Sequence, residues 1–435
     1  NDKTKQQLAQ TSGNCRFVYN HLLFLINQDY NDYLFCKNST LANGGNLEEL
    51  NFINDFDFNP YKKASALLPK LKEEFEFLQL SSSTSLQMTT KDLSDAFVDF
   101  KSKSKGMVKA KKKHINKFSF NSSIKLDIEN SRIFIPKIGY TRFKQTRPIL
   151  GKPFNVTISK QIDKWFVTIQ TKRDLSTINP TELGLTDKVV GIDLGIKKFI
   201  AISEDLDFEF RGKVYNTLKI QNIDIYGDKF EQLAKLQKRL SKKQVASNNF
   251  LKMKRKIAKL HKHIANTRQD FLHKLSTAIV KKYPNIAVEN LKIKNMSKSS
   301  KGTKIKPGKH VKSKQGLNRS ILRQGWGMFL TFLAYKLKYN YNVELMKFNP
   351  KNTSRKCSRC GHTHKDNRKS QALFVCVKCG FKCNADKNSA YNISAAGQAA
   401  HDCSDDRITC FSKKKRMVKK SKKLTITIPI SKKTG

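Results

Sequence analysis

Two Cys-x-x-Cys-Gly motifs near the end of the chain constrain its folding more than any other feature of the sequence. The motifs share one form and comprise Cys357, Cys360 and Gly361 in the first and Cys376, Cys379 and Gly380 in the second. Each motif offers two thiolates from one tight turn, and two such turns complete a tetrahedral site. The spacing predicts a zinc ribbon in which Cys357, Cys360, Cys376 and Cys379 bind a structural Zn²⁺ ion.

Three neighbouring side chains, His362, His364 and Cys383, are competing candidate ligands. The four-cysteine set needs none of them, and we expect Cys383 to be a small buried side chain. Disulfides and free thiols are the alternative interpretations of the cysteines. The chain shows no secretory signal, however, and its other cysteines are scattered without a disulfide framework. We therefore expect zinc-bound thiolates rather than disulfides, and a reducing compartment.

The net charge indicates a polyanionic partner. The 435 residues include 85 Lys plus Arg against 35 Asp plus Glu, which gives a formal net charge of +50. A chain this basic repels itself unless a polyanion neutralises it, and nucleic acid is the usual one. We expect no membrane partner, because no uninterrupted apolar run is long enough to span a bilayer. The length and the 38% hydrophobic content support several folded domains.

The periodicity of apolar residues divides the chain into regions. Helical spacing up to about Phe100 is followed by the lysine-rich run 101–117 and then by short alternating segments from Phe118 to Ile169. These segments predict a small β-barrel or sheet, and their near-even spacing favours an antiparallel barrel of the oligonucleotide-binding kind. Residues 228–280 have the pattern of long helices with a break near Ser247, which predicts a helical hairpin.

Three carboxylates stand at the ends of predicted elements in an otherwise lysine-rich chain. Asp193 lies in an apolar strand, turn and strand pattern, Glu289 ends a short apolar strand, and Asp386 begins a helix just after the second cysteine pair. Acids at strand ends can converge, and their hard oxygen ligands suit Mg²⁺ in the two-metal hydrolysis of a phosphodiester. Two simpler interpretations stay open: Asp193 could bond turn amides, and Asp386 could cap its helix.

The order and spacing of these segments resemble a known family, the transposon-encoded TnpB proteins. Four segments resemble its split RuvC nuclease and inserted zinc ribbon: Gly191–Gly195, Val288–Leu291, Thr353-Ser354 ahead of the first cysteine pair, and Asp386–Ile393. Three more resemble its helical lobe: Cys15–Asn20, Ser85–Gln87 and Ala96-Phe97. The resemblance covers nearly the whole chain and extends to eukaryotic Fanzor proteins and compact type V CRISPR effectors, which are related to this family.

The resemblance implies a multidomain α+β fold. Its parts would be a helical recognition lobe, a small OB-like β-barrel or wedge domain, and a RuvC-like α/β nuclease of the RNase H fold with the zinc ribbon inserted. We expect the lobe at 1–117, the barrel at 118–185, the nuclease at 186–350 with the helical hairpin at 228–280 and a basic lid loop at 292–318, the ribbon at 351–383, the last nuclease segment at 384–400, and a basic, disordered tail at 401–435.

The resemblance further implies an RNA-guided DNA endonuclease. Asp193, Glu289 and Asp386 would be catalytic ligands of two Mg²⁺ or Mn²⁺ ions, beside the structural Zn²⁺. The partners would be a guide RNA and a double-stranded target DNA next to a short adjacent motif, with no small-molecule substrate. The protein would act in the cytoplasm or nucleoid of a prokaryote, or in the nucleus of a eukaryote.

The chain departs from the family pattern at three places. It begins at Asn1 without Met, so we expect a further strand ahead of this numbering. Ala385 precedes Asp386 where Arg is usual, and Asn290 follows Glu289 where Asp is commoner. No carboxylate of the triad is lost, so cleavage is still expected. Three other functions stay open: a guide-dependent binder that does not cut, a transposase acting without RNA, and a compact type V CRISPR effector.

Overall fold

The structure, a computed structural model, divides the chain into two compact units. It describes residues 2–42, 60–102, 106–122, 124–146, 148–172, 188–216, 225–303, 305–405 and 424–429. The first unit is Asn1–Asp174 with Val418–Gly435, and the second is Leu175–Met417. No helix within the described ranges combines the length and apolar character needed to cross a bilayer.

Helices dominate the start of the first unit. They are α1 (Asp2–Ala42), α3 (Pro60–Glu74), the short 3₁₀ helix η2 (Glu76–Leu80) and α4 (Ser83–Lys101). One face of α1 is apolar and fully buried at Val18, Leu22 and Ile26, positions that repeat every four residues and so lie on one side of a helix. These residues share a core with Leu86 of α4 and with the strands that follow.

The strands of the first unit form two open antiparallel sheets. One has the order β1-β5-β6-β15, with β1 at Lys117–Phe120, β5 at Lys152–Gln161, β6 at Lys164–Lys172 and β15 at Leu424–Pro429. The other has the order β2-β3-β4, with β2 at Leu126–Asp127, β3 at Arg132–Ile135 and β4 at Gly139–Arg142. Within the described ranges no closed barrel forms, so the barrel prediction is wrong. Alternation of apolar residues specifies strands, whereas closure needs a ladder between the first and last strands.

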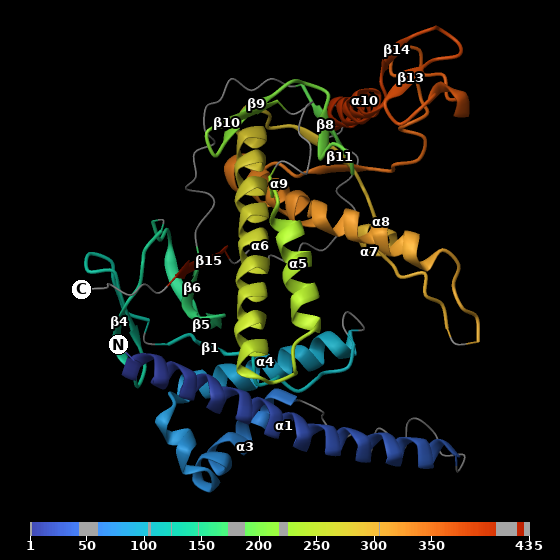
Figure 1. Cartoon of the computed structure of the whole chain (residues 1–435). Helices are drawn as coiled ribbons and strands as arrows, with labels where there is room; N and C mark the ends of the chain where they lie inside the picture. Colours follow the sequence, from blue (N-terminus) through green and yellow to red (C-terminus); the bar gives the residue numbers. More distant parts are fainter. Residues whose placement is uncertain are drawn as a thin grey trace. The chain divides into compact units, whose positions relative to one another are not determined.

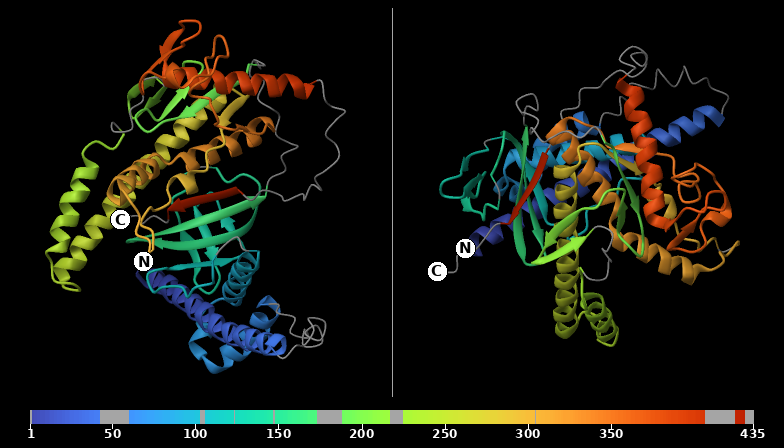
Figure 2. Two further views of the ribbon diagram at one scale, coloured as in Figure 1. Left: turned by 90° about the vertical axis from the view of Figure 1, so that its right-hand side faces the viewer. Right: turned by 90° about the horizontal axis from the view of Figure 1, so that it is seen from above.

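The end of the chain corrects a second expectation. The tail 401–435 was predicted to be disordered, yet Leu424–Pro429 forms β15, which pairs antiparallel with β6 in the register Ile426 to Ile169 (Figure 2). This segment alternates Leu or Ile with Thr, a pattern that favours an extended strand. It covers the free edge of β6 and so satisfies backbone groups that an edge strand leaves unpaired. The lysines from Lys413 to Lys415 lie outside the described residues.

A four-stranded mixed sheet organises the second unit. Its order is β12-β11-β7-β8, with β7 at Val190–Leu194, β8 at Ile200–Ile202, β11 at Ile286–Glu289 and β12 at Met346–Phe348. β11 runs parallel to both β7 and β12, whereas β8 returns antiparallel to β7. The three residues of β8 and the first three of β7 are buried, so the central strand β7 and the edge strand β8 are both covered on their two faces. A separate hairpin pairs β9 (Asp207–Phe210) with β10 (Lys213–Asn216).

Helices α5 (Lys229–Ser241) and α6 (Asn248–Lys282) lie side by side (Figure 1). The expected break falls at Ser247, whose Oγ accepts a hydrogen bond from the Phe250 amide at 3.1 Å and caps α6. Both helices contribute buried apolar residues to the core of the sheet, including Leu233 and Ile264.

The basic segment after β11 is more ordered than expected. Residues 292–318 were predicted to be a lid loop, but they include α7 (Ile293–Met296) and the start of α8 (Val311–Gln324). The helical spacing of Leu317 and Ile321 continues the pattern of the following helix and explains the difference. Gly325, with a φ of +73°, separates α8 from α9 (Trp326–Tyr341).

The last segments of the second unit are a small ribbon and a long helix. The ribbon contains η3 (Lys365–Asn367) and the antiparallel hairpin of β13 (Leu373–Val375) with β14 (Lys382–Asn384). Helix α10 (Ala385–Asp405) follows at once and packs on β7, β8 and β11. Its backbone passes so close to β7 that a Cβ placed on Gly191 would lie 2.1 Å from the Ala390 carbonyl oxygen.

Replacing Gly191 by Ala tests this close packing. The added methyl group meets backbone atoms of α10, which cannot move aside as a side chain can, so we expect a loss of about 1–3 kcal/mol in unfolding free energy. Gly316→Ala is the matched control, because its Cβ meets open space in α8 and should stabilise the helix by about 1 kcal/mol. Differential scanning calorimetry measures both, and equal thermal midpoints for Gly191→Ala and the unmodified chain would contradict the packing.

Candidate active site and metal centre

The sheet places two of the predicted acids at neighbouring strand ends. β7 and β11 are parallel, and their register pairs Ile192 with Val288. Asp193 directly follows Ile192, and Glu289 directly follows Val288. Both acids therefore stand near the carboxyl ends of two neighbouring strands. Asp386 lies in the first turn of α10, which crosses β7. The structure therefore brings together three acids that are far apart in the sequence.

The acids interact electrostatically. The pKa of Asp193 is raised to about 7, mainly by burial and then by the negative charges of Glu289 and Asp386. The pKa of Glu289 is also raised by burial, while a hydrogen bond from the Thr353 hydroxyl acts in the opposite direction. Like charges that burial keeps from water favour a cation among them.

Two simpler interpretations of these acids can now be assessed. The turn after Asp193 is closed by the Gly195 amide, which donates to the Phe199 carbonyl at 3.1 Å. The start of α10 is capped by Asn384, whose Oδ1 accepts hydrogen bonds from the amides of Asp386 and Lys387 at 3.1 and 3.2 Å. The Asp193 side chain is therefore not needed to close this turn and faces the other acids. The Asp386 side chain is not needed as the cap of α10.

An arginine that sequence reasoning missed adjoins the acids. Arg368 Nη2 lies 3.3 Å from Asp386 Oδ1, and its charge lowers the pKa of Asp193 against the larger effects of burial and the other acids. Ala385 stands where the family resemblance led us to expect an arginine. The guanidinium beside Asp386 instead comes from the ribbon, and no local sequence signal linked Arg368 to the acids.

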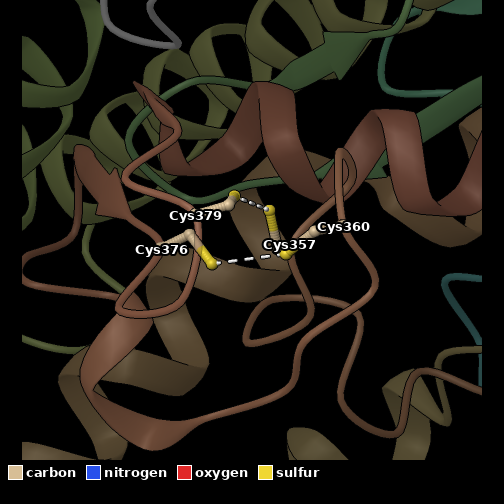
Figure 3. A group of neighbouring side chains, drawn as sticks. All are labelled: Cys357, Cys360, Cys376 and Cys379. Atoms are coloured by element: carbon tan, nitrogen blue, oxygen red, sulfur yellow. Dashed lines mark hydrogen bonds between the residues drawn. The ribbon is translucent and has the colours of Figure 1, made fainter.

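The four predicted cysteines form a cluster that fits a metal ion. The sulfur atoms of Cys357, Cys360, Cys376 and Cys379 all lie within 4.8 Å of one another, with Cys357 to Cys379 at 3.8 Å and Cys360 to Cys376 at 3.6 Å (Figure 3). Tetrahedral Zn–S bonds of about 2.3 Å place sulfur atoms about 3.8 Å apart. A disulfide would require about 2.05 Å. The cluster is therefore consistent with a zinc site and not with disulfides.

The backbone around the cysteines has the form of two knuckles. Gly361 and Gly380 adopt φ values of +74° and +69°, which favour glycine, and each donates its amide to the carbonyl of the first cysteine of its motif at 3.0 Å. Among the residues that the structure describes, the four cysteines alone form a His, Cys, Asp or Glu group compact enough for one ion. His362, His364 and Cys383 are not part of it. The acids Asp193, Glu289 and Asp386 interact electrostatically but do not form a group of that compactness.

Asparagine side chains fasten the ribbon to the helix that carries Asp386. Asn388 is fully buried; it accepts from the Ser358 amide at 3.0 Å and donates to the Lys356 carbonyl at 2.8 Å. Asn392 donates to the carbonyls of Thr353 and Lys356 at 2.8 and 2.7 Å. Sequence reasoning did not assign these contacts, because an asparagine within a helix is usually exposed.

The fold and the site together define a mixed α/β protein in which acids at parallel strand ends adjoin a four-cysteine knuckle. The family model described as "Probable transposase", of the IS605 OrfB type, matches residues 167–300. Models described as "Cas12f1-like, TNB domain" and "Helix-turn-helix domain" match residues 326–393 and 1–33. Residues 2–33 of the helix-turn-helix match lie in the single helix α1.

Curated relatives match along most of the chain. The "Putative RNA-guided DNA endonuclease InsQ" of Escherichia coli strain K12 is 38% identical over 403 residues, which cover 92% of this chain and 90% of the relative. A "Putative RNA-guided DNA endonuclease" of Streptomyces pristinaespiralis is 28% identical over 93% of this chain and 89% of its own length. The chain therefore belongs to the TnpB family, as the motifs implied.

Likeness to CRISPR effectors is more restricted. A Cas12f1 endodeoxyribonuclease from an uncultured archaeon is 46% identical over 68 residues, which cover 14% of this chain and 13% of that protein. The cryo-EM structure of the Cas12f1–sgRNA–target DNA complex is 20% identical and covers 89% of this chain and 93% of that one, with a TM-score of 0.30.

Substitution of single cysteines tests the metal centre. Cys357→Ala removes one of four ligands from the cluster, so we expect zinc content to fall from about one ion per chain to near zero and the ribbon to become susceptible to protease. Plasma mass spectrometry of the purified protein measures the metal. Cys383→Ala is the matched control, since Cys383 is near the cluster but outside it. Full zinc content in the Cys357 variant would disprove the assignment.

Proposed function

We propose that the chain is an RNA-guided DNA endonuclease whose Asp193, Glu289 and Asp386 carry the chemistry of phosphodiester hydrolysis. The observation that carries the proposal is the 38% identity over 92% of the chain to a relative named as an RNA-guided DNA endonuclease. The convergence of three acids at strand ends and at a helix start supports the site. The net charge of +50 supports RNA and DNA as partners.

The donor set of the three acids suits hard divalent cations. Carboxylate oxygens are the ligands that Mg²⁺ and Mn²⁺ prefer. The pKa of Asp193 is raised by burial first and then by the charges of Glu289 and Asp386, which the neighbouring Arg368 does not fully offset. When bound, two such ions supply an activated water and stabilise the leaving oxygen. We assign Asp193, Glu289 and Asp386 as the residues that hold them. The four-cysteine cluster holds Zn²⁺ and supports the shape of the ribbon.

Neighbouring residues orient these ligands. The Thr353 hydroxyl donates a hydrogen bond to Glu289 Oε1. This contact fixes one carboxylate oxygen and leaves the other free to bind a metal ion. Arg368 offsets the charge of Asp386 and stands where it can also bind a phosphate oxygen of the substrate. Both residues come from segments next to the cysteine knuckles, so the ribbon contributes to hydrolysis by holding Thr353 and Arg368 beside the acids.

The remaining parts receive roles by the same proposal. The helical unit at the start of the chain and its two open sheets would hold the guide RNA and read the motif beside the target, and the sheet of the second unit is assigned to a RuvC-like nuclease. The protein would unwind the target duplex and pair one strand with the guide. It would act where that DNA is, in the cytoplasm or nucleoid of a prokaryote or in the nucleus of a eukaryote.

The function is tested with the protein purified from cells that express its native locus. We expect a discrete structured RNA to co-purify and to direct cleavage of a plasmid with a matching target in Mg²⁺ buffer. Replacement of Asp193, Glu289 or Asp386 by Ala should lower the cleavage rate about a hundredfold or more, because each removes a metal ligand. RNA sequencing and a plasmid cleavage assay provide the two readouts.

Asp270→Ala is the matched control, because Asp270 is a half-exposed acid on α6 that pairs with Lys274. It should cleave at the unmodified rate. Target binding without cleavage would favour the guide-dependent binder, and DNA joining without any bound RNA would favour a transposase. Unchanged cleavage in the Glu289 and Asp386 variants would refute the site assignment while leaving the guided activity in place.

The raised pKa of Asp193 predicts that metal binding depends on pH. Below about pH 7 the metal-free protein holds a proton on this carboxyl, and a cation binds only after that proton leaves. Affinity for Mn²⁺ should therefore fall as the pH decreases from about 8 to about 6, approaching tenfold per pH unit below the pKa. Isothermal titration calorimetry at several pH values measures the slope. The Asp193→Asn variant should bind Mn²⁺ weakly, and its affinity should depend less steeply on pH. An equally steep dependence in that variant would show that Asp193 is not the group that titrates.

A further inference from the structure

A cavity in the second unit lies apart from the acids and the cysteines. It has a volume of about 790 Å³ and walls from α5, α6, α8 and the segment after α7. In Figure 1 these are the yellow-green pair of helices and the orange helix labelled α8. The volume falls within the range of about 300–1,000 Å³ that is typical of small-molecule and cofactor sites, and the cavity is open to solvent, since Arg319, Leu322 and Arg323 of its lining are exposed. The side chains that line the cavity indicate what kind of ligand it can bind.

Three arginines converge on this cavity, Arg268 of α6 with Arg319 and Arg323 of α8. The pKa of Arg323 is lowered by burial first and then by the charges of Arg319 and Arg268, so the three guanidinium groups are close neighbours. Among the described residues no carboxylate forms an ion pair with any of them. Uncompensated cations in one cavity favour an anionic ligand, and arginine suits the geometry of a phosphate.

Aromatic residues hold two of these arginines in place. The Arg323 guanidinium lies over the Phe230 ring, 4.2 Å from its centroid. Arg268 Nε donates a hydrogen bond to the Tyr226 hydroxyl at 3.0 Å. Fixing the groups before a ligand arrives lowers the entropy lost on binding. A guanidinium that lies over one ring can stack its other side on a nucleobase, a mode common in RNA recognition.

The remaining walls fit the other parts of a nucleotide. Leu233, Ile264 and Leu322 supply apolar surface, and Leu322 is 58% exposed although its side chain lines the cavity. Asn318 donates its Nδ2 to the Lys298 carbonyl at 3.0 Å, but its buried Oδ1 has no hydrogen-bond partner. A buried acceptor without a partner costs stability, so a ligand that offers a donor is favoured there. A ribose 2′-hydroxyl is such a donor, and DNA lacks it.

We propose that this three-arginine cavity, defined by Arg268, Arg319 and Arg323, binds one nucleotide of a single-stranded RNA segment. The phosphate contacts the arginines and the base stacks on Arg323 against the apolar wall. Asn318 Oδ1 is closed to solvent in the free protein, and it accepts from the 2′-hydroxyl once the Asn318 amide turns toward the ligand. The choice of RNA rests on the proposed function, since a guide RNA is the polyanion that such a protein carries. The site is separate from the acids that would cut DNA.

Photo-cross-linking of the full chain tests the proposal. The probe is a single-stranded RNA oligonucleotide with one central 4-thiouridine, added to protein freed of nucleic acid at high salt. We expect mass spectrometry to map a cross-link to peptides of α5 or α8 that line the cavity. The double variant Arg319→Ala with Arg323→Ala should reduce its yield about tenfold or more, because two charge-assisted contacts are lost. Arg239→Ala, an exposed arginine of α5 outside the cavity, is the matched control and should leave the yield unchanged.

Further arms separate the remaining outcomes. The double variant Arg319→Lys with Arg323→Lys keeps both charges and replaces the alanine variant if that one unfolds. It should still lower the cross-link yield, because lysine cannot stack on a base or bind a phosphate bidentately. A DNA probe with 4-thiothymidine should cross-link less, and Asn318→Ala should bring RNA down to that level. Equal yields for RNA and DNA would overturn the RNA assignment, and an unchanged yield in both arginine variants would overturn the site.

The result stands apart from the test of cleavage. Asp386→Ala should give the full cross-link, because Asp386 does not line the cavity. Guided cleavage with no cross-link in the cavity would refute this inference alone. A cross-link in a protein that carries no guide RNA and does not cleave would refute the proposed function alone.

Discussion

The close approach of helix α10 to strand β7 is the constraint on which the site depends. A Cβ on Gly191 would lie 2.1 Å from the Ala390 carbonyl and 2.4 Å from the Ser394 amide, so only glycine lets the helix backbone rest on the strand. The same holds further along, where a Cβ on Gly397 would meet Val189 at 2.6 Å. This packing places the start of α10, and with it the third acid, beside the strand ends. An acid near the end of the chain thereby joins one from its middle.

The electrostatics of the acids follow from that packing. A protein with a net charge of +50 gathers three carboxylates at one point, and burial together with mutual repulsion raises the pKa of Asp193 to about 7. Arg368 offsets only part of this charge. Excess negative charge at strand ends and excess positive charge elsewhere are what a metal-dependent enzyme acting on a polyanion requires, since the cations neutralise the acids and the basic surface binds the substrate.

The ribbon contributes by holding other groups in position. Its cysteines form the frame, and the fully buried Asn367 joins its two halves by donating to the Arg355 and His362 carbonyls and accepting from the Val377 amide. The next residue is the arginine beside the third acid. Buried amides of this kind are satisfied at every polar atom, so they specify one arrangement of the chain. A zinc ion bound there would act on cleavage only through this framework.

The sequence by itself identified the family and predicted the four-cysteine cluster and the three acids as site residues, because metal-ligand spacing and strand-end motifs are local and can be recognised without knowledge of the fold. It also predicted most helices from their apolar period. Only the tertiary structure decided that the expected barrel is two open sheets, that Leu424–Pro429 adds a strand, and that Arg368 and Thr353 contact the acids. Each of these depends on pairing or contact between distant segments. The local sequence predicts that a segment forms a strand, but only tertiary packing decides which strand it pairs with and which side chains it contacts.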